Sequence, residues 1–247
     1  MCATVRIAPF LDHTLLAAEA TASDIDHLCD EAVRHRMAAV CVNAAWVTRC
    51  AERLSGSGVV VAAVVGFPFG ASTSATKAYE ASQAVADGAR ELDMVAPLWA
   101  LRTGDWGYAV QDIGETVRAA HGALVKVIIE SALLSPPEIV RACEIARDAG
   151  AGFVKTSTGY HARGGATTAA VRLMRRTVRD EIGVKASGGI RDCETAAAMF
   201  AAGATRIGTS RGAELAECRD PGPRTWLELD AIPEELAAVD GAGGATP

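Results

Sequence analysis

Eight short runs of β-forming residues, separated by stretches with helical spacing, constrain the fold of this 247-residue chain more than any other feature. The runs occupy residues 10–13, 38–43, 59–66, 91–95, 124–130, 153–157, 183–187 and 206–210. Between them lie Ala- and Arg-rich stretches such as residues 23–36, 73–88, 136–150 and 167–182. The strands end at intervals of roughly 28 residues, the length of one strand plus one helix. Eight such units predict an α/β fold, a parallel (β/α)8 (TIM) barrel with outer helices.

The competing architecture is an open, doubly wound sheet, which periodicity alone does not exclude. The dinucleotide fingerprint GxGxxG, however, does not follow the first strand. Hydrophobic residues make up 50% of the chain and aromatic residues only 5%, so the core must consist largely of Ala, Val, Ile and Leu. This composition is typical of a buried parallel sheet. We therefore expect residues 1–247 to form one catalytic barrel domain, with a flexible tail from about residue 238.

Charge and cysteine usage argue against several classes of partner. The formal net charge of -6 gives no broad basic surface for nucleic acid or an anionic membrane. The seven cysteines are scattered, with no CxxC pair or His-flanked cluster of the kind that zinc needs. No apolar stretch approaches membrane-spanning length. We expect a cytoplasmic protein in a reducing compartment, with no metal site.

Two lysines near the ends of neighbouring strands are the candidate chemical groups. Lys155 lies in the run at 153–157 and Lys185 in the run at 183–187. Catalytic groups of a (β/α)8 barrel gather at the carboxyl ends of its strands. A second ammonium at roughly 4 Å would lower a lysine pKa from about 10.4 by about three units. Lys155 could then attack a carbonyl and form a Schiff base. Pairing with a carboxylate, or exposure to solvent, is the alternative for each lysine alone.

Other polar residues share these strand ends. Asp93, in the segment ELDMV, could give and accept protons, although an aspartate capping the next helix fits the local pattern equally well. Asp12 and Thr14 close the first strand and are expected to face the same space. Cys41 has no histidine obviously placed to activate it and is interpreted as pocket lining. His13 is interpreted as a hydrogen-bonded structural histidine.

Two glycine-rich turns follow the last two strands, at residues 188–189 and 208–212. The loops after strands seven and eight of such barrels often bind phosphate through backbone N–H groups. The alternative is that these glycines only form tight turns. Both turns together, with hydroxyl groups nearby, favour phosphate. The predicted contacts are Gly159, Gly188, Gly189, Gly208 and Ser210.

Seven motifs in one register identify a family resemblance. They are DHTLL at Asp12, CVNAAWV at Cys41, VGFPFGA at Val65, ELDMV at Glu91, KVIIESALL at Lys126, KTSTGYHARGGAT at Lys155 and VKASGGIRD at Val184. The chain resembles the deoxyribose-phosphate aldolases from about residue 12 to residue 212. The resemblance implies a class I lyase without metal or cofactor on a (β/α)8 barrel. It also implies a phosphosugar substrate, 2-deoxyribose 5-phosphate, cleaved to glyceraldehyde 3-phosphate and acetaldehyde, and a homodimer or higher assembly.

The resemblance also implies a role for each site residue. The family's Schiff-base lysine falls on Lys155, its second, proton-transferring lysine on Lys185, and its acid/base aspartate on Asp93. Its substrate-facing residues fall on Asp12, Thr14 and Cys41, and its phosphate contacts on the five residues named above.

The chain departs from the family pattern in three places. Residues 96–99 read APLW where a polar turn with asparagine is usual. Arg211 stands where a second small residue is common, and could either contact phosphate or face solvent. The C-terminal tyrosine of some members has no counterpart, because Tyr160 is the last tyrosine.

Two other functions stay open from the sequence. One is a Schiff-base aldolase for a different donor, which relative turnover on acetaldehyde and ketone donors would distinguish. The other is a phosphosugar-binding protein that has lost catalysis, against which the intact set of Lys155, Lys185 and Asp93 argues.

Overall fold

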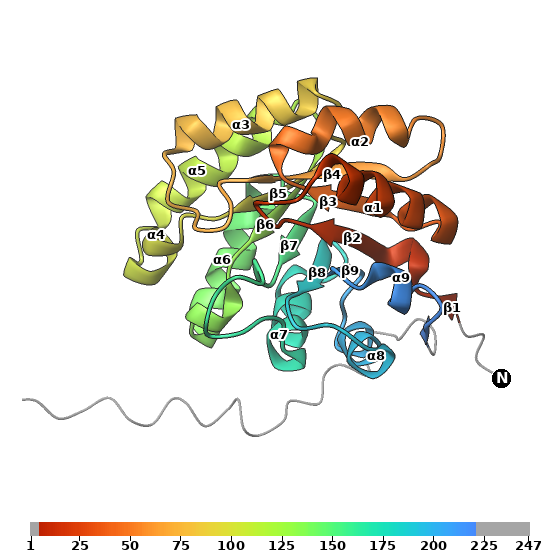
Figure 1. The fold of residues 1–247 in the computed structure, drawn as a ribbon. Helices are drawn as coiled ribbons and strands as arrows, with labels where there is room; N and C mark the ends of the chain where they lie inside the picture. Colours follow the sequence, from red (N-terminus) through yellow and green to blue (C-terminus); the bar gives the residue numbers. More distant parts are fainter. Residues whose placement is uncertain (1–4, 221–247) are drawn as a thin grey trace, which may run out of the picture.

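A computed structural model describes residues 5–220 of the chain. Eight parallel strands pair in chain order and close into a barrel, with the helices packed outside it (Figure 1). The strands are β2 (Leu11–Leu15), β3 (Ala39–Val42), β4 (Val60–Val65), β5 (Glu91–Val95), β6 (Leu124–Ile128), β7 (Phe153–Lys155), β8 (Gly183–Ser187) and β9 (Arg206–Thr209). The predicted (β/α)8 barrel is confirmed. The open sheet is excluded, because β2 also pairs with β9.

Side-chain caps start many of the outer helices. In a capping box, the Thr21 hydroxyl accepts from the Asp24 backbone N–H while the Asp24 carboxylate accepts from the Thr21 N–H. Asp192 likewise accepts from the Thr195 N–H at 2.7 Å. The helices are α1 (Ala22–His35), α2 (Val47–Arg53), α3 (Ser74–Ala86), α4 (Leu98–Thr103), α5 (Trp106–Ala119), α6 (Pro136–Asp148), α7 (Thr168–Val178), α8 (Cys193–Ala201) and α9 (Gly212–Leu215), with short 3-10 turns η1 (Ala8–Phe10), η2 (Ala44–Trp46) and η3 (Ser131–Leu133). The four helical stretches expected from the sequence correspond to α1, α3, α6 and α7.

Alternation along the strands divides apolar residues between two cores. The larger core, which includes Val40 and Val42 of β3, lies between the strands and the helices. A small second cluster, including Cys41 of β3 and Val64 of β4, faces the lumen. The remaining lumen is lined by charged residues from β2 and from β5 to β9. The barrel interior is therefore apolar on one side and ionic on the other.

The strand register sets the charged residues side by side. Asp93 of β5 is paired with Lys126 of β6, and Lys155 of β7 with Lys185 of β8. Neighbouring strands lie about 4.8 Å apart, so residues in register lie side by side. The expected adjacency of Lys155 and Lys185 is thus confirmed.

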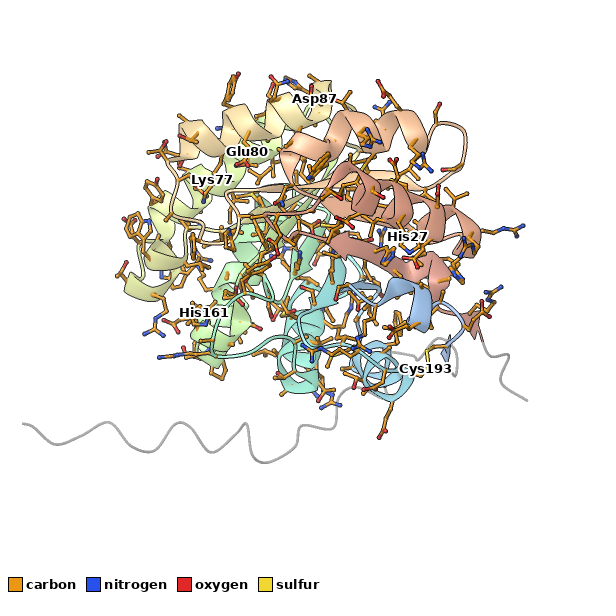
Figure 2. All side chains as sticks on the ribbon, viewed as in Figure 1. His27, Lys77, Glu80, Asp87, His161 and Cys193 are labelled. Atoms are coloured by element: carbon orange, nitrogen blue, oxygen red, sulfur yellow. A yellow bond between two sulfur atoms is a disulfide. The ribbon has the colours of Figure 1, made fainter. Side chains whose placement is uncertain are left out.

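A disulfide joins Cys193, at the start of α8, to Cys218 (Figure 2). The reducing compartment expected from the scattered cysteines does not predict this bond, and the 25-residue separation of the two cysteines gives no pairing signal in the sequence. Cys29, Cys41, Cys50 and Cys143 are free and buried. Next to the disulfide, the short strands β1 (Val5–Arg6) and β10 (Arg219–Asp220) pair antiparallel.

The expected flexible tail from about residue 238 lies outside the described residues. Within residues 5–220, no helix has the length and apolar character needed to cross a membrane.

Candidate active site

The site is built on Lys155, the last residue of β7, which is only 3% exposed. Its Nζ donates to Asp93 Oδ2 at 2.7 Å. Lys185 Nζ donates to the same oxygen, also at 2.7 Å, and makes a second ion pair with Asp12. The three residues of the predicted catalytic set therefore meet at one carboxylate oxygen.

The two lysines have opposite pKa shifts. Burial lowers the pKa of Lys155, and the Lys185 ammonium lowers it further, against the opposing effect of Asp93. Burial also lowers the pKa of Lys185, but the carboxylates of Asp12 and Asp93 outweigh this effect and raise the pKa above its ordinary value. Burial, rather than the second cation, is the larger cause at Lys155, unlike the explanation drawn from the sequence. Lys155 is therefore the lysine that can supply a neutral amine while Lys185 stays protonated.

Asp93 is a buried carboxylate surrounded by cations. Burial alone would raise its pKa, but Lys126, Lys155 and Lys185 hold it well below the usual range. Its hydrogen-bond donors are Lys126 on the neighbouring strand β6, Lys155 on β7 and Lys185 on β8, and the Cys41 Sγ lies 3.9 Å from Oδ2. The unusual segment after β5 takes no part, since the Ala96 N–H donates to the Ile128 carbonyl and Pro97 is the N-cap of α4.

Lys126 is a member of this cluster to which the sequence assigned no role. Its Nζ lies 2.7 Å from Asp93 Oδ1, 2.6 Å from Glu91 Oε2 and 3.2 Å from Asp12 Oδ2. The signal was present, because a lysine at the centre of the β-run at 124–130 needs a buried partner. Its partner could be named only after β5 and β6 were paired in register.

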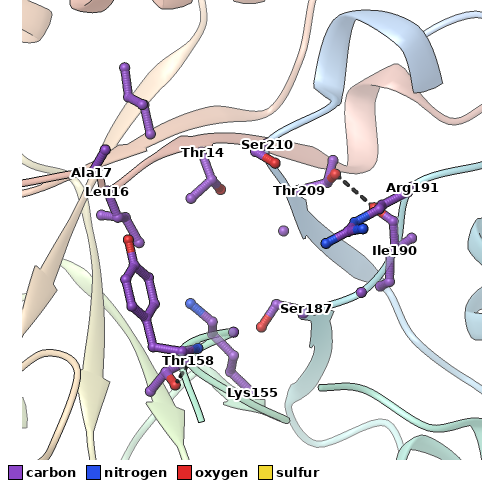
Figure 3. A pocket seen from close by; sticks show the side chains of 16 residues that line it. Thr14, Leu16, Ala17, Lys155, Thr158, Ser187, Ile190, Arg191, Thr209 and Ser210 are labelled. Atoms are coloured by element: carbon purple, nitrogen blue, oxygen red, sulfur yellow. Dashed lines mark hydrogen bonds between the residues drawn. The ribbon is translucent and has the colours of Figure 1, made fainter. Parts of the chain in front are cut away.

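A cavity of about 320 Å³ opens above Lys155 at the carboxyl ends of the strands (Figure 3). The labelled side chains of Lys155 and Arg191 point into it from opposite sides. Seven of the predicted site residues line the cavity: Thr14, Lys155, Gly159, Gly188, Gly189, Gly208 and Ser210. The other four, Asp12, Cys41, Asp93 and Lys185, are fully buried or nearly so and are not among the lining residues.

The glycines at the wide end of the cavity form a backbone cradle. Gly188 has φ +86°, and a Cβ there would lie 2.9 Å from Gly165 Cα and 3.2 Å from Gly159 Cα. A side chain at residue 188 would therefore meet backbone on two sides. Arg191 lines the same end and was missed by the sequence reasoning, although a basic residue two positions after the glycine pair was a usable signal.

The structure also places Arg211, His13 and Cys41, for each of which the sequence suggested a role. Arg211 forms an ion pair with Glu214 at 3.0 Å, is exposed and does not line the cavity, so the solvent-facing alternative holds. His13 Nε2 is hydrogen-bonded to Glu31 at 2.8 Å on the outer face of β2, as expected of a structural histidine. Cys41 lies beneath the cavity, where burial raises the pKa of its thiol, which makes it a poor nucleophile.

Among the described residues, no group of three or more His, Cys, Asp or Glu side chains could hold a metal ion. The arrangement can support amine chemistry: one lysine of lowered pKa at the base of a cavity, an ionised carboxylate beside it, and glycine backbone with an arginine lining the cavity, where an anion could bind.

A closed barrel with a cavity at the carboxyl ends of its strands, and a lysine at the base of that cavity, is the arrangement of a (β/α)8-barrel enzyme. Residues 6–215 match the profile of the DeoC/LacD family aldolases. The chain belongs to this aldolase family.

Individual relatives agree with that assignment. The deoxyribose-phosphate aldolase of Actinobacillus succinogenes is 52% identical over 207 residues, which cover 84% of this chain and 92% of the relative. That of a Geobacillus species is 53% identical over 213 residues, covering 86% and 95%. The solved tetrameric deoxyribose phosphate aldolase from Aeropyrum pernix is 32% identical, with a TM-score of 0.80 over 85% of this chain and 89% of that one.

Proposed function

We propose that this chain is a class I aldolase that reversibly cleaves 2-deoxy-D-ribose 5-phosphate to D-glyceraldehyde 3-phosphate and acetaldehyde, in deoxyribose phosphate catabolism. The observation that carries the proposal is the position of Lys155, whose amino group lies at the base of a cavity while Asp93 and Lys185 lie directly beneath it. The names of the relatives support the choice of substrate.

Substrate binding begins with the phosphate. Backbone N–H groups of the cradle formed by Gly159, Gly188, Gly189, Gly208 and Ser210 are proposed to hold its oxygens. Arg191 adds a charge-assisted contact from the cavity wall. The open-chain sugar would then extend past Thr14 toward Lys155, with its aldehyde at the amino group.

Lys155 starts the chemistry as a neutral amine. Its Nζ attacks C1, and loss of water from the carbinolamine leaves a protonated Schiff base. A base then removes the proton of the C3 hydroxyl, the C2–C3 bond breaks, and its electron pair moves into the iminium to form an enamine. Glyceraldehyde 3-phosphate leaves with C3 as its aldehyde carbon.

The second half of the reaction regenerates the free enzyme. Protonation of the enamine at C2 gives the iminium of acetaldehyde, which water hydrolyses to release acetaldehyde and Lys155. Asp93 and Lys185 are proposed to move the protons, because Asp93 Oδ2 accepts from both lysine nitrogens at 2.7 Å. Asp12 and Cys41 are proposed to complete the walls beneath the substrate.

Reductive trapping tests this proposal. Acetaldehyde and borohydride should add an ethyl group to Lys155, as located by peptide mass mapping, and the label should vanish in Lys155→Arg. Lys77 is a matched control, since it is also buried and paired, with Asp112 at 2.8 Å, but lies on α3 outside the barrel (Figure 2). Lys77→Arg should keep the label on Lys155. An unlabelled parent protein, or label at another lysine, would refute the mechanism.

The oligomeric state and the cellular location of the protein are proposed from single observations. A homodimer or higher homo-oligomer is proposed because the Aeropyrum pernix relative is tetrameric, and sedimentation velocity tests it.

A cytoplasmic location is proposed from the four free, buried cysteines, although the Cys193–Cys218 disulfide weighs against a reducing compartment. Rapid alkylation in cell lysate should label both cysteines of that pair if the proposal is right.

A further inference from the structure

Six buried charges below Lys155 form a closed ring of alternating sign, which we call the charge ring. Its members, in order around the ring, are Arg206, Asp12, Lys185, Asp93, Lys126 and Glu91. Arg206 Nη1 lies 2.6 Å from Asp12 Oδ1 and 3.2 Å from Glu91 Oε2, which closes the ring at the residues farthest from the cavity. The other links are Asp12 with Lys185, Lys185 with Asp93 at 2.7 Å, Asp93 with Lys126 at 2.7 Å, and Lys126 with Glu91 at 2.6 Å.

Glu91 and Arg206 are too far down the barrel to touch a substrate. Each is the first residue of its strand, β5 or β9, at the end opposite the cavity, and neither lines the cavity. Their side chains keep exposed fractions of 10% and 14%. Arg206 also stacks its guanidinium 5.6 Å from the centre of the Phe153 ring. Both residues therefore lie in the floor of the barrel.

The ring is electrically neutral, because three carboxylates alternate with three cations. Lys155 lies outside it and, among the described residues, makes one ion pair, to Asp93. Lys185 has two carboxylate partners and Lys126 has three. A proton on Lys155 gives the buried cluster a net charge of +1, which a low-dielectric interior disfavours. Lys155 is thus the member of the cluster that holds its proton least tightly.

We propose that Glu91 and Arg206 are positioning residues whose charges keep the ring neutral and thereby decide whether Lys155 carries a proton. The inference rests on the proposed role of Lys155 as the nucleophile and extends it to the barrel floor. Removing the arginine charge leaves the ring at -1, which stabilises the Lys155 ammonium. Removing the glutamate charge leaves the ring at +1, which favours the neutral amine.

The remaining groups around Lys155 do not offset these changes. Burial keeps the Cys41 thiol neutral by raising its pKa, and the lumen-facing residues of β4, Ala62 and Val64, carry no charge. Within residues 5–220, the charged or titratable groups around the lumen and cavity are, besides Lys155 itself, Asp12 from β2, Cys41 from β3, Glu91 and Asp93 from β5, Lys126 from β6, Lys185 from β8, Arg206 from β9, Tyr160 and Arg191 from the cavity loops, and Glu130, which accepts from the Thr158 hydroxyl in the cavity wall.

The test is the pH dependence of acetaldehyde trapping on Lys155. Arg206→Gln should move the midpoint of adduct formation up by about one pH unit, and Glu91→Gln should move it down by about one unit, as expected for a unit charge at roughly 8–10 Å. The double variant restores neutrality, so its midpoint should return to within about half a unit of the parent value. Arg206→Lys, which keeps the charge, should stay close to the parent.

Arg211→Gln is the matched control, because it removes a positive charge that is exposed near the cavity and screened by solvent. Its midpoint should not move. The inference would be overturned if the midpoints of the two single variants shift in the same direction, or if a folded variant shows no shift. If Arg206→Gln does not fold, the midpoint of Glu91→Gln alone decides the test. Absence of any Lys155 adduct in the parent would instead refute the proposed function.

Discussion

At the scale of single residues, the site depends on one carboxylate. Asp93 accepts from Lys155, Lys185 and Lys126 within 2.7 Å, and it is fully buried. Proton transfer between two lysine nitrogens requires an acceptor that reaches both, and this geometry provides one. The nucleophile and the proton carrier should therefore be separable by mutation.

Asp93→Asn is expected to lower kcat by about 10²- to 10⁴-fold, the usual contribution of a general acid or base. The acetaldehyde adduct should still form on Lys155 at the end point, because losing Asp93 removes a group that raises the pKa of this lysine and so favours the amine. Steady-state kinetics measures the fall in kcat, and peptide mass mapping measures the adduct on Lys155. Asp112→Asn, in the buried pair with Lys77, is the control and should reduce stability without this loss of kcat. Unchanged kcat in Asp93→Asn would contradict the proton-transfer role.

At the scale of elements, the loops after β7 and β8 are packed backbone to backbone. Gly188 and Gly189 both have positive φ, +86° and +83°, but only Gly188 has backbone atoms of another loop within 4 Å of its missing Cβ. Residue 188 thus needs glycine for space as well as for conformation, whereas residue 189 needs it for conformation alone.

Gly188→Ala should therefore raise KM for the phosphorylated sugar by at least about tenfold, while trapping of unphosphorylated acetaldehyde on Lys155 is kept. The physical reason is that the new Cβ pushes the cradle apart at the end of the cavity farthest from the chemistry. Gly189→Ala introduces a similar backbone strain of about 1 kcal/mol but no close contact with the neighbouring loop, so it should change KM much less. Equal effects of the two substitutions on KM would contradict the cradle.

At the scale of the whole molecule, two features lie outside the strand–helix repeat: the β1–β10 pair, which holds residues 5–6 beside residues 219–220, and the Cys193–Cys218 disulfide. The disulfide closes a 25-residue loop that contains β9 and α9. It therefore constrains the last strand that completes the barrel.

Reduction of this disulfide should destabilise the barrel by about 3 kcal/mol, from the chain entropy of a loop of this length. A fall in Tm on adding a dithiol, measured by circular dichroism, checks the prediction. Cys193→Ser should start from the lower Tm and show no further fall with the dithiol. If the parent and Cys193→Ser melt at the same temperature under oxidising conditions, the disulfide does not stabilise the fold.

Local patterns in the sequence predict the barrel and the end of it at which the cavity opens. Alternating apolar runs, glycine-terminated helices and a repeat of about 28 residues are local signals, so β2 to β9 could be placed from the chain alone. Parallel pairing then predicted that the strand carboxyl ends share one edge and that Lys155, Lys185 and Asp93 lie close together; in the structure Lys155 ends its strand, and the other two lie in mid-strand beneath the cavity.

The pairing of the buried charges, in contrast, depends on how the folded barrel brings distant residues together. Asp12 and Arg206 are 194 residues apart, and their pairing depends on barrel closure and strand register rather than on any local pattern. The same holds for the Cys193–Cys218 pair and for Lys126, whose three carboxylate partners come from two other strands. Burial and distance set a lysine's pKa, and both are properties of the folded barrel. The sequence could name Lys155 as a candidate nucleophile, but the fold sets the direction of each shift: burial lowers the pKa of Lys155, whereas carboxylate partners raise the pKa of Lys126 and of Lys185.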